Sequence, residues 1–261
     1  MKARLIGQFL PVLRQMVFRE LRMRYAGSFL GIFWTFVHPV VMLCMYILVF
    51  SFILKLKINI VRYGTDNFTF WLVAGLLPWF AFAEALLSSC YSIVSNAHIL
   101  KKTLIPAEAF PTSSVICSFI NHSVAMVIFV VVSAFLGFLN PFYPALVIYA
   151  LFLFLFALGL SYFVSAVNVF FRDISQLLSV FLNLWLYATP IFYPVDFVPK
   201  WLRGVFHVNP MYWIVDGYRS IIFKGTFSGL FFSLAAVCSA AVAIGGLAFF
   251  RRVKKGFLDV L

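Results

Sequence analysis

The chain has 261 residues, of which 64% are hydrophobic and 11% are charged, and its mean hydropathy is +1.04. A water-soluble domain of this length cannot bury that much apolar surface, so the composition indicates an integral membrane protein. The formal net charge is +12, but the cations stand at the ends of apolar blocks and are not interleaved with aromatic residues. This placement is typical of contact with membrane lipids, and nucleic acid is not expected as a partner.

The first predicted element is a basic amphipathic helix over residues 5–24. On a helical wheel its apolar side chains share one broad arc, and Gln8, Gln15, Arg19 and Arg22 lie on the opposite arc. Such a helix lies in the membrane interface; a solvated tail or a signal peptide is the alternative, but the shape does not fit a signal core. Because Glu20 and Arg24 fall on the apolar arc, we expect the helix to loosen before Tyr25.

Six apolar segments follow, and each is close to the roughly 20 residues that a membrane crossing needs. They are residues 32–54, 68–90, 113–136, 145–169, 174–193 and 230–250. The expected fold class is therefore an all-α integral membrane protein with six transmembrane helices. We expect residues 1–261 to form a single membrane domain: an interfacial helix and elbow (1–28), spans one to five (32–193), a long connection (194–229), span six (230–250) and a tail (251–261).

The connection over residues 194–229 differs from the others because it is apolar and interrupted by prolines. Within it, residues 211–223 are too short to span and contain Asp216 and Arg219. Two short re-entrant helices that dip into the outer leaflet fit this pattern better than a water-exposed loop or a seventh span.

The distribution of Lys and Arg predicts the sidedness of the six spans. Thirteen of the 20 cations fall on the side of the two termini, including the cluster at residues 251–255. Since cytoplasmic loops carry the excess of Lys and Arg, both termini are predicted to be cytoplasmic.

The chain carries few groups for energy-coupling chemistry. Lys102-Thr103 lacks the glycines of a phosphate-binding loop, so we expect neither ATP hydrolysis nor a cofactor in this chain. Within the second and third spans, Glu84 and His122 are ionisable; each is either a functional group or, as we favour, a polar helix-packing group. The four cysteines lack metal-ligand spacing, and no metal site is expected.

The connection between spans two and three contains a short amphipathic element. Apolar Ile99, Leu100, Leu104 and Ile105 alternate with polar His98, Lys101 and Lys102. It is either a loop on the lipid headgroups or a docking helix that transmits motion from a cytoplasmic partner, and the residues alone leave both open.

Four groups of motifs, in the same order as the spans, resemble those of one family. They are Arg24-Tyr25-x-x-Ser28-x-Leu30-Gly31-x-x-Trp34 up to Pro39, residues 96–111, Phe171-Arg172-Asp173, and Thr189-Pro190-Ile191-x-Tyr193 with Asn209-Pro210 and Tyr218-Arg219. Together they resemble the permease subunits of ABC-2 type polysaccharide exporters, and the resemblance covers nearly the whole chain. Members of that family are homodimers that bind two copies of a separate ATPase, which holds ATP and Mg.

The resemblance implies roles for particular residues. The coupling helix, seated in the ATPase, comprises His98, Ile99, Leu100, Lys101, Lys102, Thr103, Leu104, Ile105 and Pro106. Arg172 and Asp173 form a second, smaller cytoplasmic contact. The periplasmic gate comprises Thr189, Pro190, Tyr193, Tyr218 and Arg219.

The resemblance also implies that the first and fifth spans of two subunits enclose the polymer. Sugar rings stack on aromatic faces, and their hydroxyls need hydrogen-bond partners. The expected path residues are Arg24, Tyr25, Phe33, Trp34, Tyr46, Asn183, Trp185 and Tyr187. Each of these aromatic residues could instead belong to the belt of Trp and Tyr side chains that lies at membrane–water interfaces.

The sequence thus predicts the channel-forming subunit of an ATP-driven exporter of lipid-linked polysaccharide of O-antigen, capsule or teichoic-acid type, in a bacterial inner membrane. The chain itself is not expected to be an enzyme. A drug or small-lipid exporter of the same superfamily is the closer alternative. A secondary transporter would need charged or broken helices in matching halves, which the sequence does not display.

Overall fold

The computed structural model describes residues 2–58, 60–103, 105–201, 203–227 and 229–261, and leaves aside the side chains of residues 2–8, 25, 32, 60 and 258. Within these ranges the regular elements are helices. In addition, Lys57 and Asn67 form one isolated antiparallel bridge. The α-helices are α1 (Lys2–Tyr25), α2 (Trp34–Tyr46), α3 (Ile60–Tyr63), α4 (Phe68–Tyr91), α5 (Ala97–Lys102), α6 (Ala109–Phe135), α7 (Leu146–Phe170), α8 (Ile174–Tyr187), α9 (Arg203–His207), α10 (Pro210–Arg219), α11 (Gly229–Val253) and α12 (Phe257–Val260).

Shorter helical turns extend several of these helices. The 3-10 turns are η1 (Gly31–Phe33), η3 (Val94–Asn96), η4 (Tyr143–Ala145), η5 (Val195–Phe197) and η7 (Lys254–Gly256), and the π-helices are η2 (Ile47–Ile53) and η6 (Ser220–Lys224). Because η2 continues α2 directly, the two together make one long apolar rod.

Among the described residues, five helical stretches are long and apolar enough to cross a membrane. They are Trp34–Ile53, Phe68–Tyr91, Ala109–Phe135, Tyr143–Phe170 and Gly229–Gly256. These match the predicted spans one to four and six, with boundaries shifted by a few residues. An all-helical membrane protein is therefore confirmed.

The predicted fifth span, residues 174–193, is shorter than expected. Its helix α8 has 14 residues and ends at Tyr187. At about 1.5 Å per residue that is roughly 21 Å, less than the roughly 30 Å of a bilayer core. Pro190 disfavours helical backbone at Thr189 and has no N–H to donate, so the chain turns at residues 188–193.

The expected loosening of the first helix does not occur. Helix α1 runs without a break to Tyr25, although Pro11 lies inside it. The chain turns only afterwards, where Gly27 has φ +79° and Gly31 has φ +52°. These left-handed angles favour glycine, so the two glycines form the elbow that leads from α1 into α2.

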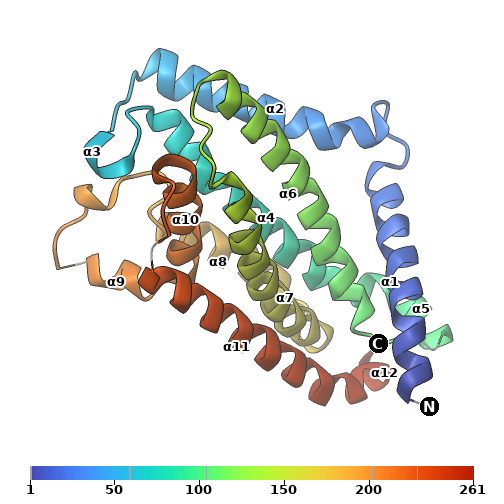
Figure 1. The fold of residues 1–261 in the computed structure, drawn as a ribbon. Helices are drawn as coiled ribbons and strands as arrows, with labels where there is room; N and C mark the ends of the chain where they lie inside the picture. Colours follow the sequence, from blue (N-terminus) through green and yellow to red (C-terminus); the bar gives the residue numbers. More distant parts are fainter. Residues whose placement is uncertain (1, 59, 104, 202, 228) are drawn as a thin grey trace.

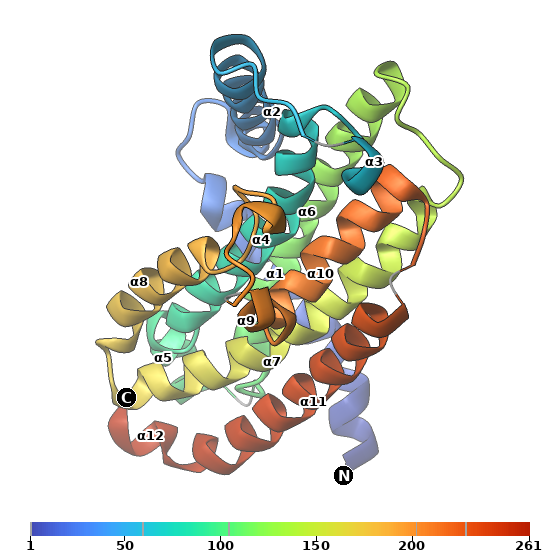
Figure 2. The same cartoon turned by 90° about the vertical axis from the view of Figure 1, so that its left-hand side faces the viewer.

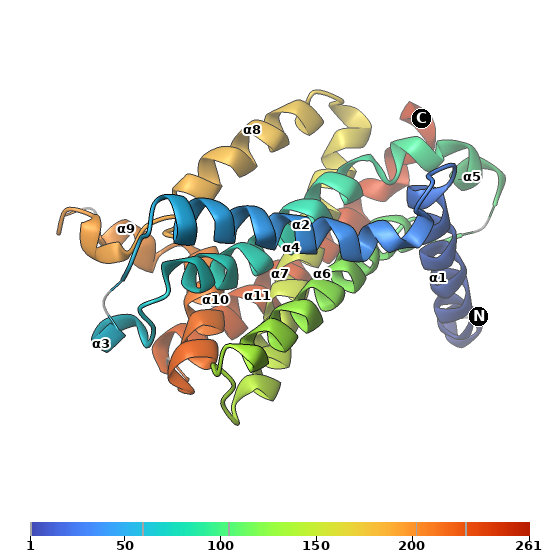
Figure 3. The ribbon, with the colours of Figure 1, turned by 90° about the horizontal axis from the view of Figure 1, so that it is seen from above.

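Helix α7 occupies the centre of the bundle and packs against α4, α6 and α11 (Figures 2 and 3). Its closest approach is to α11, where the Cβ of an alanine at Gly246 would lie 2.0 Å from the Gly159 carbonyl oxygen. Glycine on both helices therefore lets the two backbones come into contact, as small residues do in membrane bundles.

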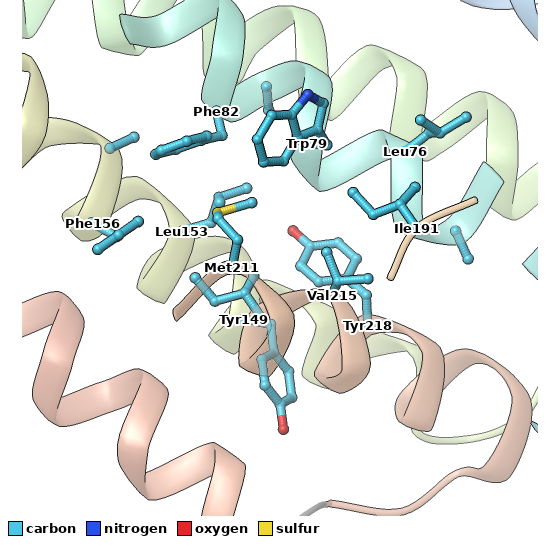
Figure 4. Close-up of a cluster of buried hydrophobic side chains, with 14 of the residues drawn as sticks. Leu76, Trp79, Phe82, Tyr149, Leu153, Phe156, Ile191, Met211, Val215 and Tyr218 are labelled. Atoms are coloured by element: carbon cyan, nitrogen blue, oxygen red, sulfur yellow. The ribbon is translucent and has the colours of Figure 1, made fainter. Parts of the chain in front are cut away.

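Figure 4 shows part of the main core, which lies between α4, α7 and α10. It contains buried aromatic and aliphatic side chains from each helix, among them Trp79, Phe82, Leu153, Phe156, Met211 and Val215. Short α10 is thus anchored in the bundle interior. It begins at Asn209, whose side chain accepts the Met211 N–H, and has Pro210 in its first turn, a favourable start for a helix.

The two ends of the bundle carry different elements. Figure 1 shows the N-terminus, the C-terminus, α5 and α12 at one end, and α3 and α9 at the opposite end. Helix α2 lies along the outside and is largely exposed. Both chain ends therefore lie at the same end of the molecule.

Candidate functional site

A polar junction joins α1 to the bundle. Glu84 of α4 accepts hydrogen bonds from Arg24 of α1 and from the Asn121 side chain of α6. Glu20 forms a 3.5 Å ion pair with Arg24 and accepts a 3.1 Å hydrogen bond from the Ser113 hydroxyl. Burial lowers the pKa of the Arg24 guanidinium, but the Glu84 and Glu20 carboxylates outweigh it and raise that pKa above its ordinary value. Glu84 therefore links three helices, in line with the helix-packing interpretation.

Beside this junction is a cleft of about 1020 Å³ between α1, α2, α4 and α6. Glu20, Arg24 and Glu84 line its end near the elbow. Most of the remaining wall is apolar and includes Met42, Leu43, Leu76, Phe80 and Ile128. A cleft of this size, with an apolar wall and a few charged groups at one end, has the dimensions and lining of an amphiphile-binding site.

The predicted path residues divide between this cleft and other places. Arg24, Trp34 and Tyr46 line the cleft, whereas Phe33 points outward with 66% of its surface exposed. The side chain of Tyr25 lies outside the described residues.

On α8, the three predicted path residues face different ways. The Trp185 ring packs against Trp79 and Phe82, with centroid distances of 6.2 and 5.3 Å, and belongs to the interior. Asn183 and Tyr187 are exposed. Of the three predicted path residues on α8, Asn183 and Tyr187 are therefore the two at the protein surface.

The predicted coupling helix over residues 98–106 is partly helical. Helix α5 ends at Lys102, and Thr103 is already extended; Leu104 lies outside the described residues. The two faces of α5 differ, because Ile99 and Leu100 pack against the chain's own core while His98, Lys101 and Lys102 are exposed. The surface that α5 offers to a partner is thus basic and polar.

The apolar face of α5 rests on a second core at the end of the bundle that holds both termini. This terminal cluster brings together α1, α6, α7, α11 and α12 through Met16, Ile93, Ala107, Ala109, Phe110, Tyr162, Ala166, Val169, Phe250 and Phe257. A 2.6 Å hydrogen bond from Arg19 to the Asn96 side chain adds a polar link between α1 and the start of α5. Helix α5 is therefore held against the bundle by the terminal cluster and by this hydrogen bond.

The second predicted contact, Arg172 and Asp173, forms the exposed turn between α7 and α8. The Asp173 carbonyl accepts the N–H groups of Gln176 and Leu177, both at 3.1 Å, and so begins α8. Figures 2 and 3 place this turn at the same end of the bundle as α5 and the C-terminus. The structure thus brings both predicted partner contacts to one end.

The predicted gate residue Arg219 is a buried pin. Its Nε donates to the Trp71 carbonyl at 3.1 Å, and its two terminal nitrogens donate to the Pro190 and Ile191 carbonyls at 2.8 and 2.9 Å. The guanidinium also stacks on the Trp71 ring, 3.4 Å from its centroid. Arg219 therefore fastens α10 to α4 and to the chain that follows α8.

The other gate residues are joined to this pin. The Asn209 side chain accepts from Trp185 at 3.0 Å and donates to the Thr189 hydroxyl at 2.9 Å. The Tyr193 hydroxyl donates to the Tyr187 carbonyl at 2.7 Å. All of these hydrogen bonds tie the end of α8 to the elements that follow it.

Tyr218, the remaining gate residue, connects to the middle of the bundle. Its hydroxyl lies 3.1 Å from His122 Nε2, and both side chains are buried. His122 thus bridges α6 and α10, in line with its interpretation as an interhelical hydrogen-bonding group.

Glu108 is a residue that the sequence analysis did not single out. It lies just before α6 and contacts both Lys254 and Arg251 at the end of α11. It is the sole acidic residue in the connection over residues 91–112, opposite a basic C-terminal cluster. That charge complementarity was the available signal.

Five helices among the described residues are long and apolar enough to cross a membrane, so the structure is that of a multi-pass helical membrane protein, with a cleft at its side. The chain belongs to the ABC-2 type transporter family, whose sequence profile matches residues 11–223. The matched range runs from α1 through η6 and contains α5, the cleft and the Arg219 pin.

The chain is also similar over most of its length to curated proteins. It is 27% identical to an O-antigen export system permease protein RfbA of Klebsiella pneumoniae, over 98% of this chain and 97% of that protein. It is 31% identical to the protein of the same name from Myxococcus xanthus, over 83% of this chain and 82% of that protein.

Proposed function

We propose that this protein is the membrane-spanning subunit of an ATP-driven exporter that moves a lipid-linked polysaccharide of the O-antigen type out of the cytoplasm, across a bacterial inner membrane. The observation that carries the proposal is the near end-to-end similarity to O-antigen export permeases, which includes α5, the cleft and the elements around Arg219. Capsule or teichoic-acid polymers share the chemistry of lipid-linked glycans and are the alternative substrates of the same class.

In this proposal the membrane is crossed six times, with α8 and the turn up to Tyr193 as the fifth crossing. The location of both termini at one bundle end supports an even number of crossings (Figure 1). The excess of Lys and Arg at that end supports a cytoplasmic location for it. Helices α9 and α10 then form the periplasmic gate, locked by Arg219.

The partner is a separate ATPase, two copies of which bind a homodimer of this chain and hold ATP and Mg. The exposed basic face of α5, with His98, Lys101 and Lys102, supplies the main docking contact, and Arg172 with Asp173 supplies the smaller one. Exposed faces of α2 and α8 from two subunits enclose the polymer, and Asn183 and Tyr187 contribute hydrogen-bonding and stacking groups.

Reconstitution in lipid vesicles tests this function. The purified chain should hydrolyse no ATP alone and should support ATP turnover with its cognate ATPase subunit, stimulated by lipid-linked O-antigen. ATP turnover by the lone chain would contradict the assignment. Stimulation by hydrophobic drugs or short lipids, and none by glycan-bearing lipid, would instead assign a small-molecule exporter.

The docking face is tested in the same assay. Lys101→Glu with Lys102→Glu should abolish co-purification with the ATPase, because the two exchanges reverse the charge of the basic face that is proposed to dock. Lys255→Glu, an exposed cation at the same end of the bundle, is the matched control and should bind normally. Equal binding by both variants would remove α5 as the docking element.

A further inference from the structure

The C-terminal segment, residues 251–261, is joined to the connection between α5 and α6 by a nearly buried carboxylate. Glu108 retains only 8% of its surface exposed. Its Oε1 accepts a hydrogen bond from the Lys254 ammonium and lies 3.7 Å from Arg251 Nε. Lys254, in η7, is 146 residues away in sequence from Glu108, and Arg251 lies in the last turn of α11, so this contact depends on the tertiary fold.

An apolar contact reinforces this ion pair. Phe250 and Phe257 are almost completely buried, and their rings lie 5.4 Å apart at 85°. Phe250 also packs on Tyr162 of α7, whose hydroxyl is 2.8 Å from the Thr112 hydroxyl of α6. The tail is therefore built into the terminal cluster.

Helix α5 rests on the same cluster from the other side. Ile99, Leu100 and Ile105 pack against it, whereas the cations of α5 face outward. With six residues, α5 is too short to hold its own orientation, since isolated helices of fewer than about 12 residues are marginal in water. Its angle to the bundle depends on what lies beneath it and on the chain that leads into α6.

We infer that Glu108, Lys254 and the buried tail form a clamp that holds α5 at a fixed angle to α6 and α11, and that the tail is thereby a positioning element for the partner ATPase. A force on α5 is passed through Glu108 to α6 and through Lys254 to α11. The partner in this inference rests on the proposed function; the clamp itself does not.

The clamp is tested first in the chain without a partner. Glu108→Gln and Lys254→Met should each accelerate trypsin cleavage after Lys102, because a loosened α5 opens more often to the protease. Lys255→Met removes the neighbouring exposed cation and should leave that rate unchanged. The exchanged pair Glu108→Lys with Lys254→Glu should restore the slow rate of cleavage. If Glu108→Gln fails to fold, Lys254→Met and the exchanged pair carry the test.

The positioning role is tested in the vesicle system. Glu108→Gln and Lys254→Met should bind the ATPase as tightly as the unchanged chain but lower the polymer exported per ATP by about threefold or more. Unchanged cleavage rates together with unchanged export per ATP overturn the inference. Loss of ATPase binding by Lys254→Met also overturns it, because the tail then contacts the partner directly.

The two proposals fail separately. If the unchanged chain does not bind an ATPase, the proposed function fails while the trypsin experiment still decides the clamp. If ATPase binding and export are normal in every clamp variant, the proposed function stands and the positioning role of the tail fails.

Discussion

Arg219 carries a charge into the interior of the protein, where each of its bonded nitrogens meets a main-chain carbonyl. A planar guanidinium presents several donors in fixed directions, whereas an ammonium is a compact point charge on a flexible stem. Three carbonyls from two separate segments, at Trp71 and at Pro190 with Ile191, can therefore be held at once only by arginine.

We expect Arg219→Lys to destabilise the purified protein by about 2 kcal/mol, because carbonyls that arginine satisfied are left without a donor. The matched control is Arg203→Lys. Arg203 also donates to carbonyls, those of Val198 and Asp196, but it is half-exposed, so water can replace the lost donors. Thermal unfolding in detergent measures both variants. Equal losses of stability in the two variants would show that burial does not make the Arg219 hydrogen bonds more important than those of Arg203.

Gly75 makes room for that guanidinium. A Cβ at this position would lie 2.5 Å from a terminal nitrogen of Arg219. We expect Gly75→Ala to push the guanidinium off its carbonyls and to cost about 1–3 kcal/mol. Because both substitutions act on one network, Gly75→Ala combined with Arg219→Lys should cost less than the sum of the two. A strictly additive double variant, measured by the same unfolding assay, would contradict this explanation.

At the scale of elements, the contact of α7 with α11 is decided by two adjacent glycines that differ in surroundings. A Cβ at Gly246 would lie 2.0 Å from the Gly159 carbonyl oxygen, whereas a Cβ at Gly245 would meet nothing within 4 Å. Gly246 faces the partner helix and Gly245 faces away, so one position is a packing requirement and the other is not.

Gly246→Ala should therefore separate α7 from α11 and lower stability by about 1–3 kcal/mol. Gly245→Ala should be neutral or slightly stabilising, by up to about 1 kcal/mol, since alanine is the better helix former. Unfolding temperatures of the two variants, which have the same composition, give the comparison. The reverse order of stability would refute this helix contact.

At the scale of the whole molecule, α1 is held on the bundle by apolar packing in the terminal cluster and by a few polar side chains. Arg24 reaches Glu84, 60 residues along the chain, and Arg19 reaches Asn96. The Arg24 contact also forms one end of the cleft. The same ion pair therefore contributes both to the position of α1 and to the shape of the cleft.

A double-mutant cycle of Arg24→Gln and Glu84→Gln should give a coupling free energy of about 1 kcal/mol, near the upper value for partly exposed pairs. Amide hydrogen exchange in α1 should be faster in either single variant. Arg22→Gln, an exposed arginine on the same helix, should leave exchange in α1 unchanged. A coupling energy of zero would mean that packing alone holds α1.

The sequence by itself determined that the protein is helical and lies in a membrane, because in a bilayer the length of an apolar segment and the need to pair every backbone group leave few other folds. Four of the six predicted spans are found within about six residues of their expected ends, and the first span differs mainly in finishing as a π-helix. The motifs also indicated the right family, which depends on local residue order.

The tertiary structure alone decided which side chains meet. Helical periodicity indicates that Arg24, Trp185 and Ile99 share faces with apolar residues, but it does not indicate the partner that each face finds. Arg24 pairs with Glu84, Trp185 packs into the interior, and Ile99 covers the terminal cluster. Arg219 meets Trp71 across 148 residues, and Lys254 meets Glu108 across 146. Such pairings depend on how whole helices cross, which a one-dimensional pattern does not contain.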